Sequence, residues 1–430
     1  MKHRIVVISV DAMVSEDVPE LLSMPNCSAL FKQCLYVQRM KTVYPSLTHP
    51  VHASLITGQP CGKTGIVHNE HFDPFCPAPV WYNKLNEIRC ETLFHQAHHA
   101  GLKVGVSRWP VTAQGNSCID YLIPEILDSD LAQGIPMEQA LAKSGSAPIM
   151  ASIVQPNLHL LDNGNVRPGY DAFSAACAAD MIRIYQPDLL FTHWGMVDSA
   201  RHRYGLFGPH ISHALEWTDQ WIGLLAKAAK DAGVFEQTSF VVLSDHGQLA
   251  FSQELRLNSL FREKGLLDVD GNGQVRDYRA YAHSCGMGAQ IYLKDASDQE
   301  LTNDTQRLIT EELRSRTGTD FEVLTRQEAE ERFGLFGNFS FVVETDGKTS
   351  FENEAVGAVM QRLDAGKERE LLATHGHMPD KGPQPPLLAA GPAFRCATLE
   401  EGNVLEVAPT LAAIMGIGES GKAVREDWLA

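Results

Sequence analysis

Short apolar runs that alternate with helix-like patterns place the strongest constraint on how this chain folds. Residues 4–10 read RIVVISV, a β-branched run that ends directly before Asp11. Further runs and helical patterns then alternate along the chain, the runs at 103–107, 187–193 and 238–243 and the helical patterns at about 90–101, 169–185 and 209–232. Continuous apolar runs are typical of strands buried on both faces, and their alternation with helices favours a parallel sheet. We predict an α/β fold, a three-layer sandwich with a largely parallel central sheet and helices on both faces.

A stretch of different character interrupts this alternation. It holds short strand-like runs at residues 289–293 and 339–345 and a charged helical pattern at residues 297–315. Beyond it, a late strand and a closing helix are predicted at 387–391 and 405–415. A chain of 430 residues is too long to fold around one small hydrophobic core, so more than one structural unit is expected. We predict a core formed by residues 1–253 and 356–430, with an inserted α+β subdomain at 254–355 that serves as a cap or lid.

Net charge and cysteine usage narrow the classes of partner. The formal net charge of −17 argues against a nucleic-acid polymer or an anionic membrane as the main partner. It does not argue against a phosphate substrate, because bound metal ions can invert the local field. No run approaches the ~18 apolar residues of a membrane-spanning helix, and the N-terminal run is too short for a secretory signal. With nine scattered cysteines that read as reduced thiols, we expect a cytoplasmic protein.

Aspartate and histidine side chains follow several of the predicted strands. They are Asp11 after the first run, Asp198 and His202 in a D-x-x-x-H motif, Asp245 and His246 in SDHGQ, and His375 and His377 in ATHGHMPD. Each alone could end a strand, lie on a solvated helix face or form a turn. Carboxylates crowded at one sheet edge repel each other, however, and cations would neutralise them. Mixed Asp and His ligands suit zinc or a related divalent metal, and paired metals are suited to displacement at phosphorus.

The stretch YPSLTHPVHASLITG, residues 44–58, contains a candidate nucleophile. Thr48 stands two residues before Pro50 at the expected first turn of a helix. One interpretation is an ordinary N-cap threonine. The other is a nucleophile held at the positive end of the helix, where a phosphoryl group would bind.

In their order and spacing these motifs resemble the alkaline phosphatase superfamily, most closely the type I phosphodiesterase/nucleotide pyrophosphatase family. The resemblance extends from Asp11 to the closing segment LEVAPTLAAIMGI, and so covers most of the chain outside the insert. It implies an alkaline-phosphatase-like metal-hydrolase core in which Thr48 is the nucleophile. The ligand sets that it implies are Asp198, His202 and His375 for one zinc, and Asp11, Asp245, His246 and the Thr48 oxygen for the other. Asn69, in the segment NEHFDP, would hold a non-bridging phosphate oxygen.

The implied reaction has two in-line steps, through a phospho- or nucleotidyl-threonine on Thr48. Two divalent ions are expected as cofactors, zinc first, with manganese or iron as alternatives. The expected partner is a small phosphate ester or nucleotide. The resemblance places the substrate pocket near His49, Trp81, Tyr82 and Trp109, which could instead belong to the core. The insert would form a lid or wall on the leaving-group side.

Three alternatives stay open. A phosphonoacetate hydrolase would use the same metals and threonine to cleave a carbon–phosphorus bond. A phosphomonoesterase or phosphomutase of the same superfamily would differ in its substrate. A binding module that keeps metal sites without catalysis is the alternative from a different class.

Overall fold

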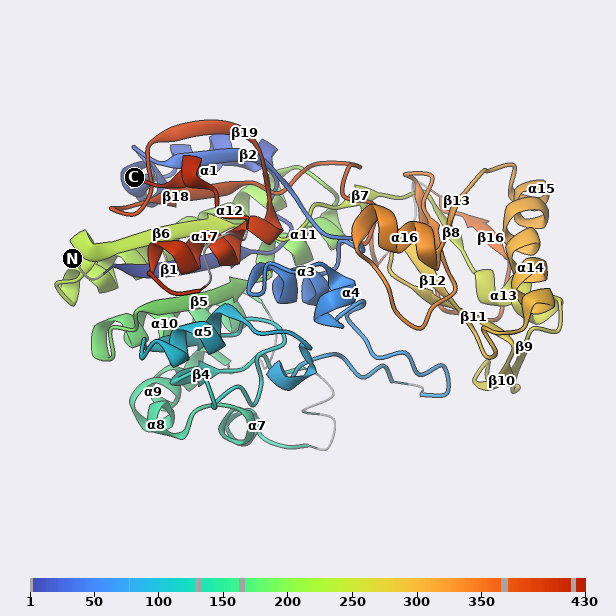
Figure 1. Cartoon of the computed structure of the whole chain (residues 1–430), viewed down its shortest axis with the longest axis horizontal. Coiled ribbons are helices and arrows are strands. Elements are labelled where there is room, and N and C mark those ends of the chain that lie inside the picture. Colours follow the sequence, from blue (N-terminus) through green and yellow to red (C-terminus); the bar gives the residue numbers. More distant parts are fainter. Residues whose placement is uncertain are drawn as a thin grey trace.

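An eight-stranded sheet forms the centre of the molecule (Figure 1). The computed structural model describes residues 3–76, 78–127, 131, 134–161, 167–364, 370–418 and 423–430. In spatial order the strands are β19 (Ala397–Asn403), β2 (Leu35–Lys41), β18 (Leu387–Ala390), β6 (Thr238–Leu243), β1 (Arg4–Val10), β5 (Leu189–Trp194), β3 (Val104–Ser107) and β4 (Tyr121–Ile123). Only β18 runs antiparallel to its neighbours in this sheet. The predicted α/β fold with a largely parallel sheet is confirmed.

Strand β1 shows why the apolar runs are continuous. It pairs in parallel with β5 on one side and β6 on the other. Ile5 and Val7 point into the apolar cluster on one face of the sheet, and Val6 and Ile8 point into the cluster on the other. Because both faces are covered, every position from the second onward is buried and must be apolar or satisfied.

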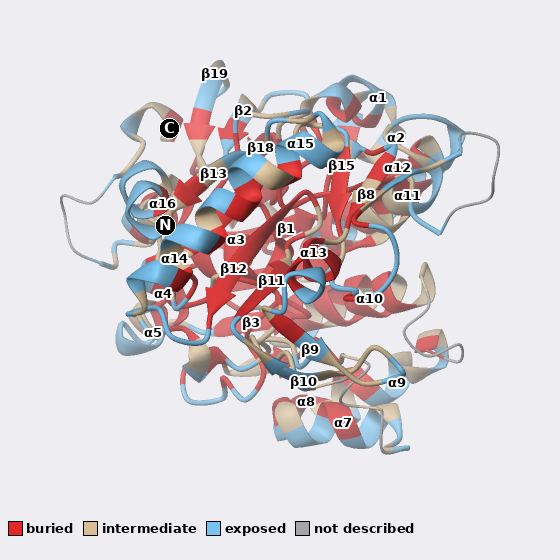
Figure 2. Ribbon diagram, turned by 90° about the vertical axis from the view of Figure 1, so that its right-hand side faces the viewer, coloured by how far each residue is buried: buried red, intermediate tan, exposed pale blue. Residues whose placement is uncertain are grey.

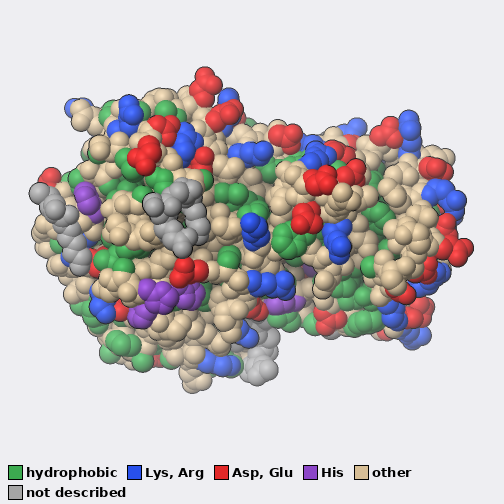
Figure 3. All heavy atoms as spheres, viewed as in Figure 1, with side chains coloured by type: hydrophobic (Ala, Val, Ile, Leu, Met, Phe, Trp, Pro, Cys, Tyr) green, Lys and Arg blue, Asp and Glu red, His purple; other side chains and the backbone are tan. Residues whose placement is uncertain are grey.

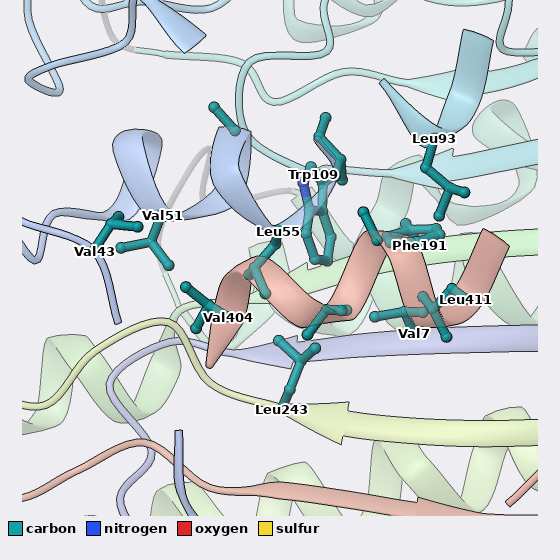
Figure 4. Close-up of a cluster of buried hydrophobic side chains, with 14 of the residues drawn as sticks. Val7, Val43, Val51, Leu55, Leu93, Trp109, Phe191, Leu243, Val404 and Leu411 are labelled. Carbon is teal, nitrogen blue, oxygen red and sulfur yellow. The ribbon is translucent and has the colours of Figure 1, made fainter. Parts of the chain in front are cut away.

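Two layers of helices cover the sheet. On one face lie α10 (Gly169–Ile184), α11 (Met196–Tyr204) and α12 (Pro209–Asp231), with α1 (Val18–Ser23) and α2 (Pro25–Leu30). On the other lie α3 (Thr48–Leu55), α5 (Leu93–His99) and α17 (Val407–Ile414). Figure 4 shows the second interface, where Leu55, Leu93 and Leu411 meet Val7 and Phe191 of the strands. The shorter helices of this core are α4 (Cys61–Thr64), α7 (Met137–Ser144), α8 (Ala147–Ile149) and α9 (Gln155–Asn157).

A second unit of sheets and helices lies beside this core, in yellow and orange in Figure 1. Its main sheet has the order β11 (Ala280–Ser284), β12 (Gly288–Leu293), β14 (Phe341–Glu344) and β13 (Glu322–Thr325). Two smaller sheets join β15 (Thr349–Phe351), β8 (Gln253–Leu255) and β16 (Met360–Arg362), and β10 (Val275–Tyr278) and β9 (Leu267–Val269). The helices are α13 (Leu257–Glu263), α14 (Gln299–Arg307), α15 (Leu313–Thr317) and α16 (Arg326–Phe333). A separate apolar cluster from Leu255 to Val359 fills this unit, which we call the insert. The predicted helix over 297–315 is divided between α14 and α15.

The insert is firmly docked on the core. Tyr292 and Phe339 of the insert belong to the same apolar cluster as Tyr44 of the core. Gly62 of α4 donates its N–H to the carbonyl of Gly334 at 3.1 Å. A Cβ atom at Gly62 would come within 2.2 Å of the Phe336 ring, so only glycine permits this approach.

Burial follows the layers. Figure 2 shows strands buried along most of their length, while the outer faces of helices such as α14 are exposed. None of the nine cysteines, all of them among the described residues, forms a disulfide. Within the described ranges, none of the helices combines the length and apolar character needed to cross a membrane. The short strands β7 (Leu249–Ala250) and β17 (Ala373–Thr374) pair at the junction where the chain leaves and rejoins the core.

Candidate metal centre and nucleophile

The strand order brings three of the sequence motifs to one edge of the sheet. β6, β1 and β5 are neighbours, and parallel strands end at the same edge. Asp11 follows β1, and Asp245 follows β6 after one intervening residue. Asp198 lies in the first turn of α11, which starts directly beyond β5. The N–H of Ala12 donates to Asp245 Oδ1 at 3.1 Å, which ties two of these strand ends together.

Asp198, His202 and His375 form the first ligand group. Their donor atoms lie within 4.8 Å of one another. His202 Nε2 is 3.2 Å from Asp198 Oδ1, and His375 Nε2 is 3.9 Å from the same oxygen. His202 Nδ1 donates to the carbonyl of Ala373 at 2.7 Å, which leaves Nε2 with the free lone pair. The structure thus brings together the three residues proposed for one metal.

Asp11, Asp245, His246 and Thr48 form the second group around one imidazole nitrogen. His246 Nε2 lies 3.5 Å from Asp11 Oδ1, 3.2 Å from Asp245 Oδ2 and 3.3 Å from Thr48 Oγ1. Asp198 is also within 4.8 Å of Asp11 and His246, so the two groups adjoin. The other three proposed residues of the second set therefore each place an oxygen within 3.5 Å of His246 Nε2.

The carboxylates of this edge fit a pair of divalent cations. Asp11 Oδ1 and Asp245 Oδ2 are buried and have no hydrogen-bond partner among the described residues. Burial, with repulsion from Asp245 and Asp198, raises the pKa of Asp11 well above its ordinary value. Burial also raises the pKa of Asp245 and lowers that of His246 to about 3. Buried carboxylate oxygens without a hydrogen-bond partner, beside neutral imidazoles, are costly alone and are suitable ligands for zinc-like ions.

Thr48 does not cap its helix, so the N-cap interpretation is wrong. α3 begins at Thr48 itself; its N-cap residue is Leu47, and no side chain caps the helix. The Thr48 hydroxyl instead lies beside His246, and the residue is only 8% exposed. The hydroxyl is therefore available to a metal and to a substrate at the start of the helix.

Asn69 lies at the same helix start. Its Oδ1 accepts the N–H of His49 at 2.9 Å, which fixes the orientation of the amide. In the described part of the chain its Nδ2 group donates no hydrogen bond. The arrangement leaves that N–H donor free for an oxygen of a bound phosphate.

Two buried histidines behind the ligands were missed by the sequence analysis. His193, the fifth residue of β5, places Nε2 3.1 Å from Asp11 Oδ2. His52 places Nε2 2.9 Å from Ser9 Oγ and Nδ1 3.6 Å from Asp245 Oδ2. Burial and the nearby His193 lower the pKa of His52 to about 3, so it is neutral. The signals that could have found them are a histidine inside an apolar strand and one helical turn between Thr48 and His52.

The proposed pocket residues divide into two classes. His49 is buried beside the helix start, 3.4 Å from Glu125 through its Nε2, and its ring meets the edge of Trp81 at 5.1 Å. Tyr82 is half-buried against His71. Trp109 is fully buried in the core and donates its indole N–H to the carbonyl of His52 at 3.3 Å. Its prediction as a substrate-binding residue is therefore wrong, because neither face of its ring is open.

The insert borders the site beyond Asn69. A cavity of about 280 Å³ starts at Glu70 and is lined on its other side by Tyr281 and His283. His68, Glu70 and His283 could hold a cation by proximity alone. His68 Nε2, however, donates to the carbonyl of Ser284 at 2.8 Å, and its Nδ1 accepts the N–H of Glu70 at 3.0 Å. With both ring nitrogens in use, this cluster is a polar link between core and insert.

His377 does not join either ligand group. Its Nδ1 lies 3.1 Å from the carbonyl of Met378 and 3.5 Å from Ser46 Oγ. Burial lowers its pKa to about 4, so it is neutral. It forms part of the packing between the segment of His375 and the loop before Thr48.

Comparison with known proteins gives a consistent result. A model of the type I phosphodiesterase/nucleotide pyrophosphatase family matches residues 5–377. Ectonucleotide pyrophosphatase/phosphodiesterase family member 1 of Mus musculus is 24% identical over 242 residues, covering 54% of this chain and 21% of its own length. Family member 7 of Rattus norvegicus is 22% identical over 316 residues, covering 69% of this chain and 62% of its own length. The chain thus spans about a fifth of the length of the first of these relatives.

A solved structure shares the fold. Murine ectonucleotide pyrophosphatase/phosphodiesterase 5, an inactive variant in complex with AMP, superimposes with a TM-score of 0.66 at 18% identity. The match covers 100% of both chains. The common fold therefore includes the insert as well as the central sheet.

Proposed function

The chain belongs to the type I phosphodiesterase/nucleotide pyrophosphatase family, and on this basis we propose that it hydrolyses phosphate diesters or nucleotide pyrophosphate bonds. The observation that carries the proposal is the place of the Thr48 hydroxyl, 3.3 Å from His246, a histidine next to two carboxylates that each keep one buried oxygen without a hydrogen-bond partner among the described residues. A hydroxyl among metal ligands at the start of a helix is an activated nucleophile aimed at an anionic centre.

The residues present would hold two divalent ions. Asp198, His202 and His375 would hold one, and Asp11, Asp245, His246 and the Thr48 oxygen the other. Zinc suits this donor set best, and manganese or iron are alternatives. When bound, the ions would lower the pKa of the Thr48 hydroxyl, neutralise the carboxylates and stabilise charge on the phosphoryl oxygens.

The proposed reaction has two steps, and the side chains of Thr48 and Asn69 act in them. Deprotonated Thr48 Oγ1 attacks phosphorus in line, and the bond to the leaving oxygen breaks with its electron pair. The resulting phospho- or nucleotidyl-Thr48 is then hydrolysed by water, which restores the hydroxyl. Asn69 Nδ2 donates to a non-bridging oxygen and stabilises the charge that develops in both steps.

A small substrate fits the surroundings of the site. Trp81, half-buried with its ring against the buried ring of His49, offers an aromatic surface near the helix start, where a base or another leaving group could pack. On the face in Figure 3, acidic and basic side chains are interspersed, with no continuous basic surface for a polymer. The related murine protein was solved with AMP, which favours a nucleotide as one class to test. We also propose that residues 254–355 form a lid or wall over the site and that the protein is cytoplasmic.

A panel of model substrates tests the proposal. The zinc-loaded protein is assayed with bis-p-nitrophenyl phosphate, p-nitrophenyl phosphate, the p-nitrophenyl ester of thymidine monophosphate, and phosphonoacetate. We expect the two diesters to show the highest kcat/KM. A preference for the monoester or for phosphonoacetate would establish one of the alternatives from the same superfamily. No turnover of any of the four would favour a binding module.

A further inference from the structure

A buried glutamate of the insert is hydrogen-bonded to two segments of the core. Glu344, the last residue of β14, is 0% exposed. Its Oε2 accepts the phenol of Tyr44 at 2.8 Å. Its Oε1 accepts the backbone N–H of Met378 and the ammonium of Lys381, each at 3.0 Å. Both oxygens of this carboxylate are therefore satisfied, and their three partners on the core side come from two loops that lead to the site.

Those two loops carry the nucleophile and a metal ligand. Tyr44 stands four residues before Thr48, and Met378 stands three residues after His375. The loops are also bonded to each other, because the N–H of Gly376 donates to the carbonyl of Ser46 at 3.1 Å. Ser46 Oγ donates to the carbonyl of His377 at 2.8 Å. A shift of Glu344 would thus be felt at both loops.

The turn between β11 and β12 of the insert contacts the backbone of His375, the proposed metal ligand. The N–H of Met287 donates to the carbonyl of His375 at 2.8 Å. Gly376 adopts a φ of +94°, and a Cβ atom there would lie 1.8 Å from the carbonyl oxygen of Cys285. The backbone of the insert therefore packs directly on the residue after His375, with no room for a side chain.

One cation and several neutral or paired groups surround Glu344. Lys381 is the cation in contact with it, and Tyr44 and Cys285 are neutral neighbours. Glu322 is its cross-strand neighbour on β13 and is paired with Arg332. Burial raises the pKa of Glu344 to about 7, against the opposing effect of Lys381. A buried acid so expensive to ionise needs a reason beyond packing.

We propose that Glu344 is a positioning residue of the reaction: through Tyr44 and Met378 it holds the Thr48 loop and the His375 loop in register with each other. The insert would then act as a fixed clamp on the site. This inference rests on the proposed function for its kinetic consequence, and on the proposed ligand role of His375 for its effect on metal affinity.

The test compares Glu344→Gln with Glu352→Gln in the zinc-loaded protein. Glu352 is a matched control, because it lies in the insert and burial likewise raises its pKa to about 7. Its carboxylate accepts from Ser350 at 3.1 Å, within the same unit. We expect Glu344→Gln to lower kcat by ~10–100-fold with little change in KM for bis-p-nitrophenyl phosphate. Competition with a chelator should show one of the two zinc sites weakened by a similar factor, and Glu352→Gln should change neither quantity.

The outcomes separate this inference from the proposed function. If the wild type turns over no diester, the proposed function fails, and selective weakening of one zinc site in Glu344→Gln still supports the clamp. If Glu344→Gln matches Glu352→Gln in both kcat and zinc affinity, the clamp is refuted. Should Glu344→Gln not fold, Tyr44→Phe removes one of its hydrogen bonds and keeps the carboxylate. A smaller loss of kcat in Tyr44→Phe then supports the clamp, and unchanged kcat and zinc affinity refute it.

Discussion

Two buried acidic regions of the molecule differ in how their oxygens are satisfied. At the sheet edge, Asp11 and Asp245 each keep a buried oxygen that has no hydrogen-bond partner among the described residues. At the junction with the insert, both oxygens of Glu344 accept hydrogen bonds, and Lys381 balances its charge. The first region is incomplete without cations, whereas the second is complete as protein alone.

The difference shows how to distinguish a binding group from a positioning group. A carboxylate with a free, buried lone pair must gain its partner from outside the chain. A carboxylate whose partners all come from the chain fixes the segments that supply them. The predictions below use this contrast, and each would break it or sharpen it.

Metal removal should have the largest effect. Aspartate and histidine bind cations only when deprotonated, so chelation at mildly acidic pH should remove two ions and abolish hydrolysis. Adding zinc back should restore it. Elemental analysis checks the stoichiometry, and an active protein with at most one equivalent of transition metal would contradict the two-metal proposal.

Loss of the nucleophile should come next. Thr48→Ala should lower kcat by at least ~10³-fold, since no other hydroxyl replaces the attacking oxygen. Zinc content should stay near two equivalents, and stability should change little because Thr48 caps no helix. Thr48→Ser keeps a hydroxyl and should retain part of the activity. Near-wild-type turnover in Thr48→Ala would mean that water attacks phosphorus directly.

Asn69 should show the effect of a single donor. Asn69→Ala should lower kcat by ~100-fold, the scale for one lost hydrogen bond to developing charge. Steady-state kinetics with bis-p-nitrophenyl phosphate measure it. Gln114→Ala serves as the control, because Gln114 lies in a loop and is not among the proposed site residues. If the KM of Asn69→Ala rises while its kcat is unchanged, Asn69 contributes to substrate binding and not to stabilising the transition state.

The last expected effect concerns stability and pH at Glu344, and it leaves catalysis aside. Its pKa is about 7 in the folded protein against 4.5 for the free side chain. Below pH 4.5 the carboxyl is neutral in the folded and in the unfolded protein, so its burial costs little. As the pH rises from there through 7, the unfolded protein ionises the group more easily than the folded protein does, and stability against unfolding is lost. Wild type should lose roughly 3 kcal/mol more than Glu344→Gln between about pH 4 and pH 8. Denaturant unfolding at several pH values checks this, and identical pH dependence of the two proteins would refute the shifted pKa.

Much of the sheet and of the ligand set could be predicted from the sequence, for one physical reason. β1, β5 and β6 are buried on both faces, so their runs are continuously apolar and the polar residues that follow them stand out. β2 and β19 were not predicted, because β2 has buried positions only at intervals and β19, which reads ATLEEGN, has a single buried position. Pairing across the sheet, and not local composition, makes these two segments strands.

The remaining features depend on distant partners. The strand that ends at Glu344 was predicted, but its contact with Tyr44 joins residues 300 positions apart, which no local pattern reveals. Trp109 has the same composition signal whether it stacks on a substrate or fills the core, and only its burial decides. The direction of β18 likewise follows from the return of the chain after the insert, and its sequence is equally consistent with a parallel strand.

The strand order also bears on how the chain matures during synthesis. β1 is made first, yet its two partners are β5 and β6, and β2 waits for β18 and β19. A nascent chain therefore leaves one edge of β1 unpaired until Leu189–Trp194 has emerged and the other edge unpaired until Thr238–Leu243 has emerged. Closing such long loops is slow. Fragments that stop before β6 leave one edge of β1 open to other chains, and fragments that also lack β5 leave both edges open, so expression of partial chains should end in aggregation.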